Sequence, residues 1–561
     1  MTGKHYTLCL FIFAILNSSI LSKTLEEDRE YIQKLQAECE NNKKFIVKRQ
    51  YSVECLTTHQ HYNSLSTKRY SESTALRREN VRIGGFNLWH PGSQNSIHKD
   101  YKLVAKIIND FDVISALELL PLVNIDLKNN NSVLDYLDET PRRIKNLKND
   151  YRAAVRAGND DDAEDIKAEI TRLERDLKKA PKLYRSPGYL KLLTELRKLD
   201  DTWSLILSPR GDSAKVIHVK ELTGFFYRGR TVKPITNDHC QETYKKSKGK
   251  KIACFPNLRK SFMNRETSFV FSRRPLLASF KSGNFDFSLL TSHVVFTSPH
   301  PVEKREEMER ILGPSFGVKE YHGIGVGVDS QNYARFAESK VILELMDKLK
   351  SKYKEKDILY IGDMNLKVRN AYWSTLLKDH SEPHLLVEDA TSLSTSQYNS
   401  QGERTNAMAS NYDHFISPNG SFSNCLKRNG EYDVKRIPYL SGDVKQYIQE
   451  NYIVRSKRLK NTIFEEEASE SVEEPFVNDY GLTRDGRKLL ATQLSNYSKK
   501  LSKVYTVKRD EIVKDDSKNE LKLKYFEERV FLSQLKRSTF YRVYKELISD
   551  HYPILMKCSN K

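Results

Sequence analysis

The chain has 561 residues and a formal net charge of +19 at pH 7, with 93 Lys or Arg against 74 Asp or Glu. This length exceeds that of a usual single domain, so two domains or one domain with large insertions are expected. The charge favours an anionic partner such as nucleic acid or an acidic membrane surface, with a merely soluble basic surface as the alternative. The sequence has no Walker loop, dinucleotide fingerprint or internal repeat, which argues against P-loop, Rossmann and repeat proteins.

Residues 1–22 are predicted to be a secretory signal peptide. Lys4 and His5 precede the apolar core 8–16, and cleavage is expected after Ser22. The core is too short for a stable membrane anchor, and a buried first helix is the alternative. The prediction is therefore a secreted or periplasmic protein with no membrane anchor once the signal is removed.

Loss of Cys9 with the signal would leave six of the seven cysteines. They are Cys39, Cys55, Cys240, Cys254, Cys425 and Cys558. An even number in an exported chain predicts disulfides, and the spacing does not match a zinc site. Six cysteines allow 15 pairings, so the connectivity stays open.

Two regions before the first motif differ in character. Residues 23–80 are predicted to be a helical extension and linker, because a charged helical pattern over 25–39 precedes a Ser/Thr/Tyr-rich stretch. A solvated, partly disordered arm is the alternative. Residues 101–109 carry apolar side chains at helical spacing, which predicts a helix packed on a sheet.

A first insertion is predicted over about residues 127–202. Charges and regularly spaced apolar residues over 133–177, broken at 158–162, predict an antiparallel helical hairpin. The hairpin is either solvent-exposed or a surface for an unknown partner. A further helix at 189–199 and a strand at 203–208 are expected to follow.

The segment 237–271 contains a basic loop between Cys240 and Cys254. Its lysines include Lys245, Lys246 and Lys248, followed by Lys250 and Lys251. Such a loop is suited to sequence-independent contact with phosphates, and a mobile loop without a ligand is the alternative. A second insertion, predicted at about 426–545, contains an acidic run at 465–474 that is expected to be a solvated linker.

Four short stretches share one pattern, in which an apolar run is ended or interrupted by Asn, Asp or His. They are IGGFNLW at 83–89, ILYIGDMNL at 358–366, NYDHFI at 411–416 and SDHYPI at 549–554. Buried strands that deliver polar groups to a site at their ends have this pattern. The last stretch is predicted to be the C-terminal strand.

Together, these stretches resemble the endonuclease/exonuclease/phosphatase superfamily, most closely its deoxyribonuclease I branch. The resemblance runs through most of the chain from about Val81, in the same order and with similar spacing. It implies an α/β sandwich of two packed mixed sheets over residues 81–561, with the two insertions. The sequence departs from the family at Trp89, Met364, His414 and the bulky segment 294–296, which concerns the choice of substrate.

The resemblance also implies roles for individual residues. The implied catalytic residues are His293 and His551, with Glu221 and Asp413 as their respective carboxylate partners. The implied metal ligands are Glu118, Asp363, Asn365 and Asp550. The implied phosphate-binding residues are Asn87, Arg228 and Arg273, joined by the lysine loop.

These residue types suit phosphodiester hydrolysis, which needs an activated water, a proton donor for the leaving oxygen and positive charge on the phosphoryl group. Histidine titrates near neutral pH, and an adjacent carboxylate fixes its tautomer and raises its pKa. Hard oxygen ligands favour Mg²⁺, with Ca²⁺ or Mn²⁺ as alternatives, over zinc.

The expected function is therefore an exported, metal-dependent endonuclease that cleaves DNA, which the family precedent implies leaves a 5′-phosphate. The alternatives are a phosphodiesterase or phosphatase acting on a phospholipid or inositol-phosphate headgroup, and a non-catalytic partner-binding protein. The resemblance also places the segments around Asp413 and His551 on neighbouring strands. Cys425 and Cys558 are then expected to form a disulfide if residues 417–424 turn back.

Overall fold

In a computed structural model, most of the chain from Asn80 onward is described. The described residues are 27, 29, 30, 33, 34, 37, 59–60, 63–64, 80–92, 98–120, 127–183, 188–208, 221–245, 251–263, 270–298, 301–316, 328–370, 372–378, 380, 384–393, 409–437, 443–455, 480–482, 484–489 and 539–561. The predicted signal peptide, most of the linker, Cys39, Cys55 and the acidic run at 465–474 lie outside them.

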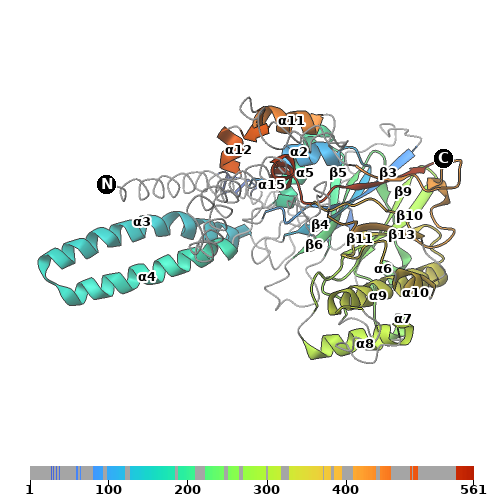
Figure 1. The fold of residues 1–561 in the computed structure, drawn as a ribbon, viewed down its shortest axis with the longest axis horizontal. Coiled ribbons are helices and arrows are strands. Elements are labelled where there is room, and N and C mark those ends of the chain that lie inside the picture. The colour runs from blue at the N-terminus through green and yellow to red at the C-terminus, as the bar shows by residue number, and fades with distance from the viewer. Residues whose placement is uncertain are drawn as a thin grey trace, which may run out of the picture.

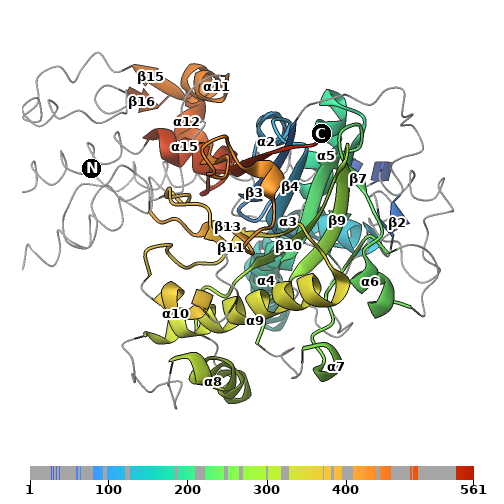
Figure 2. The same cartoon turned by 90° about the vertical axis from the view of Figure 1, so that its right-hand side faces the viewer.

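Two mixed sheets form the centre of the fold (Figures 1 and 2), which confirms the predicted α/β sandwich. The first sheet has the order β14 (Val434–Arg436), β17 (Ile554–Ser559), β3 (Asn80–Asn87), β4 (Val113–Leu119), β6 (Leu222–Arg228), β5 (Trp203–Leu207). The second has the order β12 (His384–Leu385), β13 (Asp413–Ser417), β11 (Ile358–Asp363), β10 (Phe285–His293), β9 (Leu276–Ser282), β7 (Lys233–Pro234), and β8 (Ala253–Cys254) also pairs with β9. Within these sheets, β3 and β4 are parallel, as are β10 and β11, and the other pairs are antiparallel.

The inner faces of the two sheets enclose one apolar core. Ile83 and Phe225 of the first sheet pack with Ile361 of the second, and all three are fully buried. The sheets approach closely at Gly85, where a Cβ atom would lie 2.5 Å from Cγ2 of Ile361. A larger residue at 85 would therefore push the sheets apart at the strand that carries Asn87.

Helices cover the outer face of each sheet (Figure 2), because each sheet also presents alternate apolar residues outward. The first sheet is covered by α2 (Tyr101–Ile108), α5 (Gly188–Leu199) and α15 (Thr539–Leu547). The second is covered by α8 (Val302–Phe316), α9 (Ser330–Tyr353) and α10 (Tyr372–Lys378), with α7 (Lys260–Met263) beside them. The expected helix at 101–109 is thus confirmed, and Asp100 caps it by accepting from the amides of Lys102 and Leu103.

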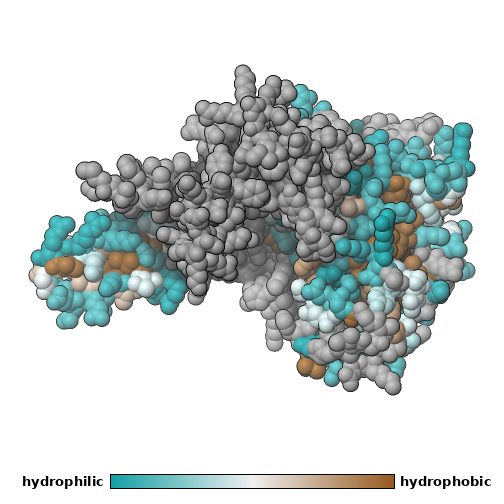
Figure 3. Space-filling model, in the orientation of Figure 1, coloured by the Kyte–Doolittle hydropathy of each residue, from teal (hydrophilic) through white to brown (hydrophobic). Residues whose placement is uncertain are grey.

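The predicted helical hairpin consists of α3 (Leu127–Ala157) and α4 (Asp160–Leu183), which extend away from the sheets (Figure 1). Ile144, Ile170 and Leu173 form the small core between the two helices. Figure 3 shows hydrophilic residues along its outer edges. In contrast, α5, which falls within the same predicted insertion, packs into the core over the first sheet.

Described elements of the second predicted insertion also pack with the first sheet. β14 lies within it, yet pairs with β17 as the edge strand of the first sheet. α11 (Asp443–Tyr452) then packs over that sheet through Val444 and Ile448. α12 (Arg484–Leu489) follows, and β15 (Ile453–Arg455) pairs with β16 (Tyr480–Leu482).

Near the N-terminus, β1 (His59–Gln60) pairs with β2 (Asn63–Ser64).

Two disulfides are formed among the described residues, one within a local loop and one between segments that are distant in sequence. Cys240, in α6 (Asp238–Thr243), is bonded to Cys254, and Cys425, in the 3-10 helix η7 (Ser423–Cys425), is bonded to Cys558. The second pair was expected on the premise that the segments around Asp413 and His551 are neighbouring strands. That premise is wrong, because β13 and β17 belong to different sheets, and the disulfide instead joins η7, between β13 and β14, to β17 of the first sheet. The last strand begins at Ile554 rather than at residue 549, and Cys558 lies within it. None of the described helices is long and apolar enough to cross a membrane.

Candidate active site

Strand ends from both sheets meet at one edge of the sandwich. β3 and β4 of the first sheet and β10 and β11 of the second all end there, and β6, β13 and β17 begin there, because each runs antiparallel to one of them. The polar residues at this edge are Asn87, Glu118, Glu221, His293, Asp363, Asp413 and His551. The structure therefore brings together the four predicted catalytic residues and other polar residues, from Asn87 to His551, which are about 460 positions apart in the chain.

Asn87 connects the two sheets at the centre of this group. Its Nδ2 donates to Oε1 of Glu118 at 3.0 Å and to Oδ2 of Asp363 at 3.2 Å. Its Oδ1 accepts from the amide of Trp89 at 3.0 Å. The side chain is 1% exposed, so one amide fixes two carboxylates in a site shielded from water.

His293 is held by Glu221 from the first sheet. The His293 Nδ1 lies 2.9 Å from Glu221 Oε2, and Arg273 approaches both oxygens of the same carboxylate at 2.6 Å. Burial alone would raise the pKa of Glu221, but hydrogen bonds from His293 and His90 and the charge of Arg273 hold it far below its usual value. Glu221 is thus an anion that orients the His293 ring.

His551 is held in the same way by Asp413, with 2.6 Å between Nδ1 and Oδ2. Burial would lower the pKa of His551, but the charge of Asp413 and its hydrogen bond raise it well above the usual value. His551 precedes β17 rather than lying in a strand, and its amide donates to Oγ of Ser549 at 3.1 Å. Its position is therefore set by a hydrogen-bonded turn.

Asp363 lies between the two histidines. Its Oδ2 is 3.8 Å from Nε2 of His293 and 3.7 Å from Nε2 of His551. In both rings Nδ1 faces the supporting carboxylate, so Nε2 is the nitrogen directed to the common centre. A phosphoryl group placed near Asp363 would have an imidazole on each side.

The buried carboxylates fit a divalent cation. Oε2 of Glu118 is buried and accepts no hydrogen bond among the described residues. Glu118 has a left-handed φ of 58°, at a register shift between β4 and β6, and such bulges redirect a side chain at the cost of backbone strain. Glu118 and Asp363 would hold the cation, because hard oxygen ligands suit Mg²⁺, Ca²⁺ or Mn²⁺.

Two other predicted metal ligands, Asn365 and Asp550, make hydrogen bonds or ion pairs with neighbouring residues. Nδ2 of Asn365 donates to the carbonyl of Val294 at 3.0 Å, and its backbone amide donates to Oδ1 of Asp363 at 2.9 Å. Oδ2 of Asp550 pairs with Nζ of Lys545 at 3.3 Å, and Asp550 belongs to neither of the two histidine-carboxylate clusters at this edge. Asn365 thus positions Asp363, whereas Asp550 lies beside the site.

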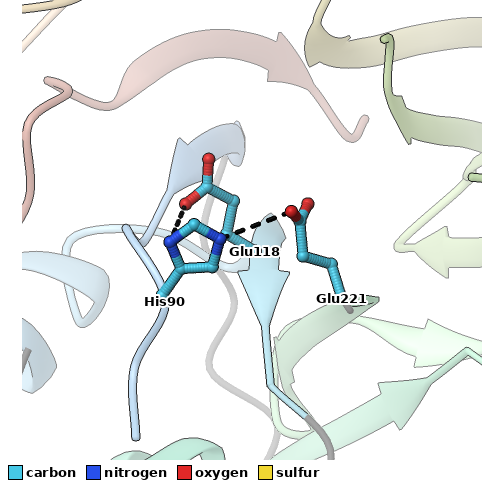
Figure 4. A group of neighbouring side chains, drawn as sticks. All are labelled: His90, Glu118 and Glu221. Carbon is cyan, nitrogen blue, oxygen red and sulfur yellow. Dashed lines mark hydrogen bonds and ion pairs between the residues drawn. The ribbon is translucent and has the colours of Figure 1, made fainter. Parts of the chain in front are cut away.

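His90, which the sequence did not single out, enters the site directly after β3. Its Nδ1 lies 3.1 Å from Oε2 of Glu118, and its Nε2 lies 3.3 Å from Oε1 of Glu221 (Figure 4). Burial would lower its pKa, but hydrogen bonding to Glu221 and the charges of both glutamates raise it. Only its position three residues after Asn87 could have indicated this role.

Two residues of α9, on the outer face of the second sheet, support the site. The sequence did not indicate either of them. The buried Glu338 accepts from the amides of Ser272 at 2.8 Å and Val295 at 3.2 Å. One turn earlier, Arg335 donates to the carbonyl of Asn365 at 2.9 Å. These contacts hold the loop that carries Arg273 and the loops that follow His293 and Asp363.

Arg228 was predicted to bind phosphate at the site, but it lies at the other end of β6. Arg228 ends β6, whereas Glu221 precedes it, so the two are separated by a strand length of about 20 Å. Arg228 is 5% exposed, donates to Asn109 and lies 3.6 Å from a carboxylate oxygen of Asp200. Its side chain completes the core at the opposite edge, over the ring of Trp203.

The described base of the lysine loop also lies away from the site. Glu242, in the α6 helix that leads to Lys245, pairs with Lys352 at 3.2 Å near the end of α9. This contact lies near the start of β11, one strand length, or about 20 Å, from Asp363. Lys245 is exposed there, while Lys246 and Lys248 lie outside the described residues.

No protein-family model and no curated protein matches this sequence. Solved structures that resemble the chain include proteins of the endonuclease/exonuclease/phosphatase family. One such family protein, from Bacteroides thetaiotaomicron, is 10% identical over 85% of this chain and 97% of its own, with a TM-score of 0.32. A mannosyl-6-phosphatase from the same organism is 13% identical over 60% and 86% of the two chains, with a TM-score of 0.27. The human nocturnin catalytic domain with bound sulfate is 9% identical over 62% and 84%, with a TM-score of 0.29. None of these similarities decides the reaction.

Proposed function

We propose that the chain is a metal-dependent phosphodiester hydrolase that cleaves DNA. The observation that carries this proposal is the placement of Asp363 between two imidazoles, each held through Nδ1 by its own buried carboxylate. Two such pairs facing one centre meet the need for both a base and an acid in hydrolysis.

In the proposed reaction, the imidazoles of His293 and His551 divide two tasks. One Nε2 takes a proton from the attacking water, and the other gives a proton to the leaving oxygen. A divalent cation held by Glu118 and Asp363 supplies positive charge to the phosphoryl oxygens. Asn87 donates to both carboxylates and so fixes their relative position.

DNA is the proposed substrate because the chain carries a net charge of +19 and phosphate contacts contribute most sequence-independent affinity. Arg273, which is partly exposed beside His293, supports this choice. Export is also proposed, on the signal-like residues 1–22 and on the two disulfides. N-terminal sequencing of the protein from the culture medium or periplasm would test export.

The test of the function is nicking of supercoiled plasmid by the purified chain in Mg²⁺, with and without EDTA. The expected result is nicking that EDTA abolishes and that leaves 5′-phosphate ends. Parallel reactions contain RNA and liposomes of sphingomyelin or phosphoinositides. Hydrolysis of lipid headgroups without plasmid nicking would show that the substrate is a lipid rather than DNA. Nicking that persists in excess EDTA would refute metal dependence.

A further inference from the structure

We propose that His90 is a nitrogen ligand of the divalent cation that Glu118 holds, which makes the site selective for Mn²⁺ over Mg²⁺. The inference rests on the proposed function only in taking Glu118 as a metal ligand. It concerns a residue that neither the sequence patterns nor the catalytic roles above include. Imidazole nitrogen favours first-row transition ions, whereas Mg²⁺ prefers oxygen.

The distance between the two ligand atoms supports this role. Nδ1 of His90 lies 3.1 Å from Oε2 of Glu118. Two atoms that each lie about 2.1 to 2.2 Å from one cation, at right angles, are separated by about 3.0 to 3.1 Å. Oε2 of Glu118 is buried and accepts no hydrogen bond within the described part of the chain. The pair is thus already spaced as neighbouring ligands.

The second ring nitrogen of His90 faces another carboxylate. Its Nε2 lies 3.3 Å from Oε1 of Glu221 (Figure 4). Glu221 is itself fixed by Arg273 and His293. An Nε2–H that donates to this carboxylate leaves the lone pair of Nδ1 directed at Glu118. Ligating histidines in proteins commonly have such a carboxylate on the second nitrogen.

The backbone that places the His90 ring adopts an energetically unfavourable conformation. Trp89 and His90 have φ angles of 46° and 48°, in the left-handed region that non-glycine residues disfavour. The amide of Trp89 donates to Asn87, so the turn is tied to the residue that joins Glu118 and Asp363. Strain of this kind accumulates at functional sites.

The test is pulsed electron paramagnetic resonance of Mn²⁺ bound to the full chain, with Mn²⁺ and Mg²⁺ affinities from calorimetry. His90→Asn is the main variant, because Asn tolerates a left-handed φ and offers no imidazole. The matched control is His384→Asn, which alters an exposed histidine at the start of β12. Circular dichroism confirms that both variants fold.

The wild type and His384→Asn are expected to show nitrogen-14 modulation that His90→Asn lacks. His90→Asn should weaken Mn²⁺ binding about 10- to 100-fold and change Mg²⁺ binding much less. Modulation that persists in His90→Asn, wild-type Mn²⁺ without nitrogen coupling, or no Mn²⁺ binding would each overturn the inference. A wild type with coupling that depends on His90 but without hydrolysis would refute the proposed function and leave this inference intact.

Discussion

The hydrogen bond between His551 and Asp413 is short and buried, so replacing Asp413 by Asn should affect both catalysis and stability. Asn keeps the size of the side chain but removes the charge that raises the pKa of His551. Loss of a charge-assisted hydrogen bond costs about 1.5 to 3 kcal/mol of unfolding free energy. Loss of acid or base assistance reduces hydrolysis about 10²- to 10⁴-fold.

The stability effect should depend on pH in a defined direction. The raised pKa of His551 stabilises the fold below the unfolded value of about 6.5, and this contribution is lost as pH rises through the folded pKa. The lowered pKa of Asp413 stabilises the fold above about pH 4, and its contribution is lost at lower pH. The pair therefore contributes fully between about pH 4 and 6.5.

Urea unfolding of the metal-free wild type and Asp413→Asn at pH 5.5 and pH 9 measures this effect, and plasmid nicking measures the catalytic one. The matched control is Asp389→Asn, which alters an exposed aspartate nearby. We expect the difference in unfolding free energy between the wild type and Asp413→Asn to be larger at pH 5.5 than at pH 9. A gap that does not change with pH, or nicking within threefold of the wild type, would refute this reasoning.

Three further predictions test other parts of the structure. Arg273→Gln should reduce plasmid nicking more than tenfold. Arg228→Gln should leave turnover unchanged but lower the unfolding free energy by about 3 to 5 kcal/mol, because it breaks a buried ion pair. Unchanged nicking in Arg273→Gln together with reduced nicking in Arg228→Gln would place Arg228, rather than Arg273, at the site. Replacing both Cys425 and Cys558 by Ser should remove about 5 kcal/mol, because their disulfide spans 133 residues, and a change below 1 kcal/mol would contradict it. Burial lowers the pKa of Lys99 to about 7, so between pH 7 and 10 the unfolded chain binds more protons and stability should rise with pH; urea unfolding of Lys99→Met should lack this rise, and equal slopes would exclude it.

The patterns and the family resemblance in the sequence indicated residues that the structure gathers at one edge, because the ends of strands occupy defined positions in a sheet. Asn87, His293 and Asp363 each end an apolar run, and the structure places all three at one edge. His551 lies at the same edge, but the strand predicted from residue 549 begins only at Ile554, and His551 forms an isolated bridge with Ser392 before it. The Asp-His-aromatic pattern therefore did not define the secondary structure of this segment.

Arg228 shows why charge near a motif is weaker evidence. It lies only seven residues after Glu221, but a strand carries it about 20 Å away to a buried pair with Asp200. The short distance in sequence could not show whether Arg228 lies at the site or at the opposite end of the strand, because both ends of β6 adjoin loops. The direction of the strand relative to the site was needed.

His90 and Glu338 were missed for different reasons. His90 acts through a left-handed turn, and no local pattern predicts where such a turn points a ring. Glu338 lies on α9 among other charged residues, and its burial depends on two loops that are distant in sequence. Neither role follows from periodicity, which describes only the face of an element.

The central claim is that His293 and His551 act as one catalytic unit. Its most direct test is plasmid nicking by His293→Ala, His551→Ala and the double variant in saturating Mg²⁺, with folding checked by circular dichroism. If the two residues act together, each single variant should lose about 10²- to 10⁴-fold, and the double variant should be little worse. Near-wild-type activity in either single variant, or fully additive losses in the double variant, would contradict the account.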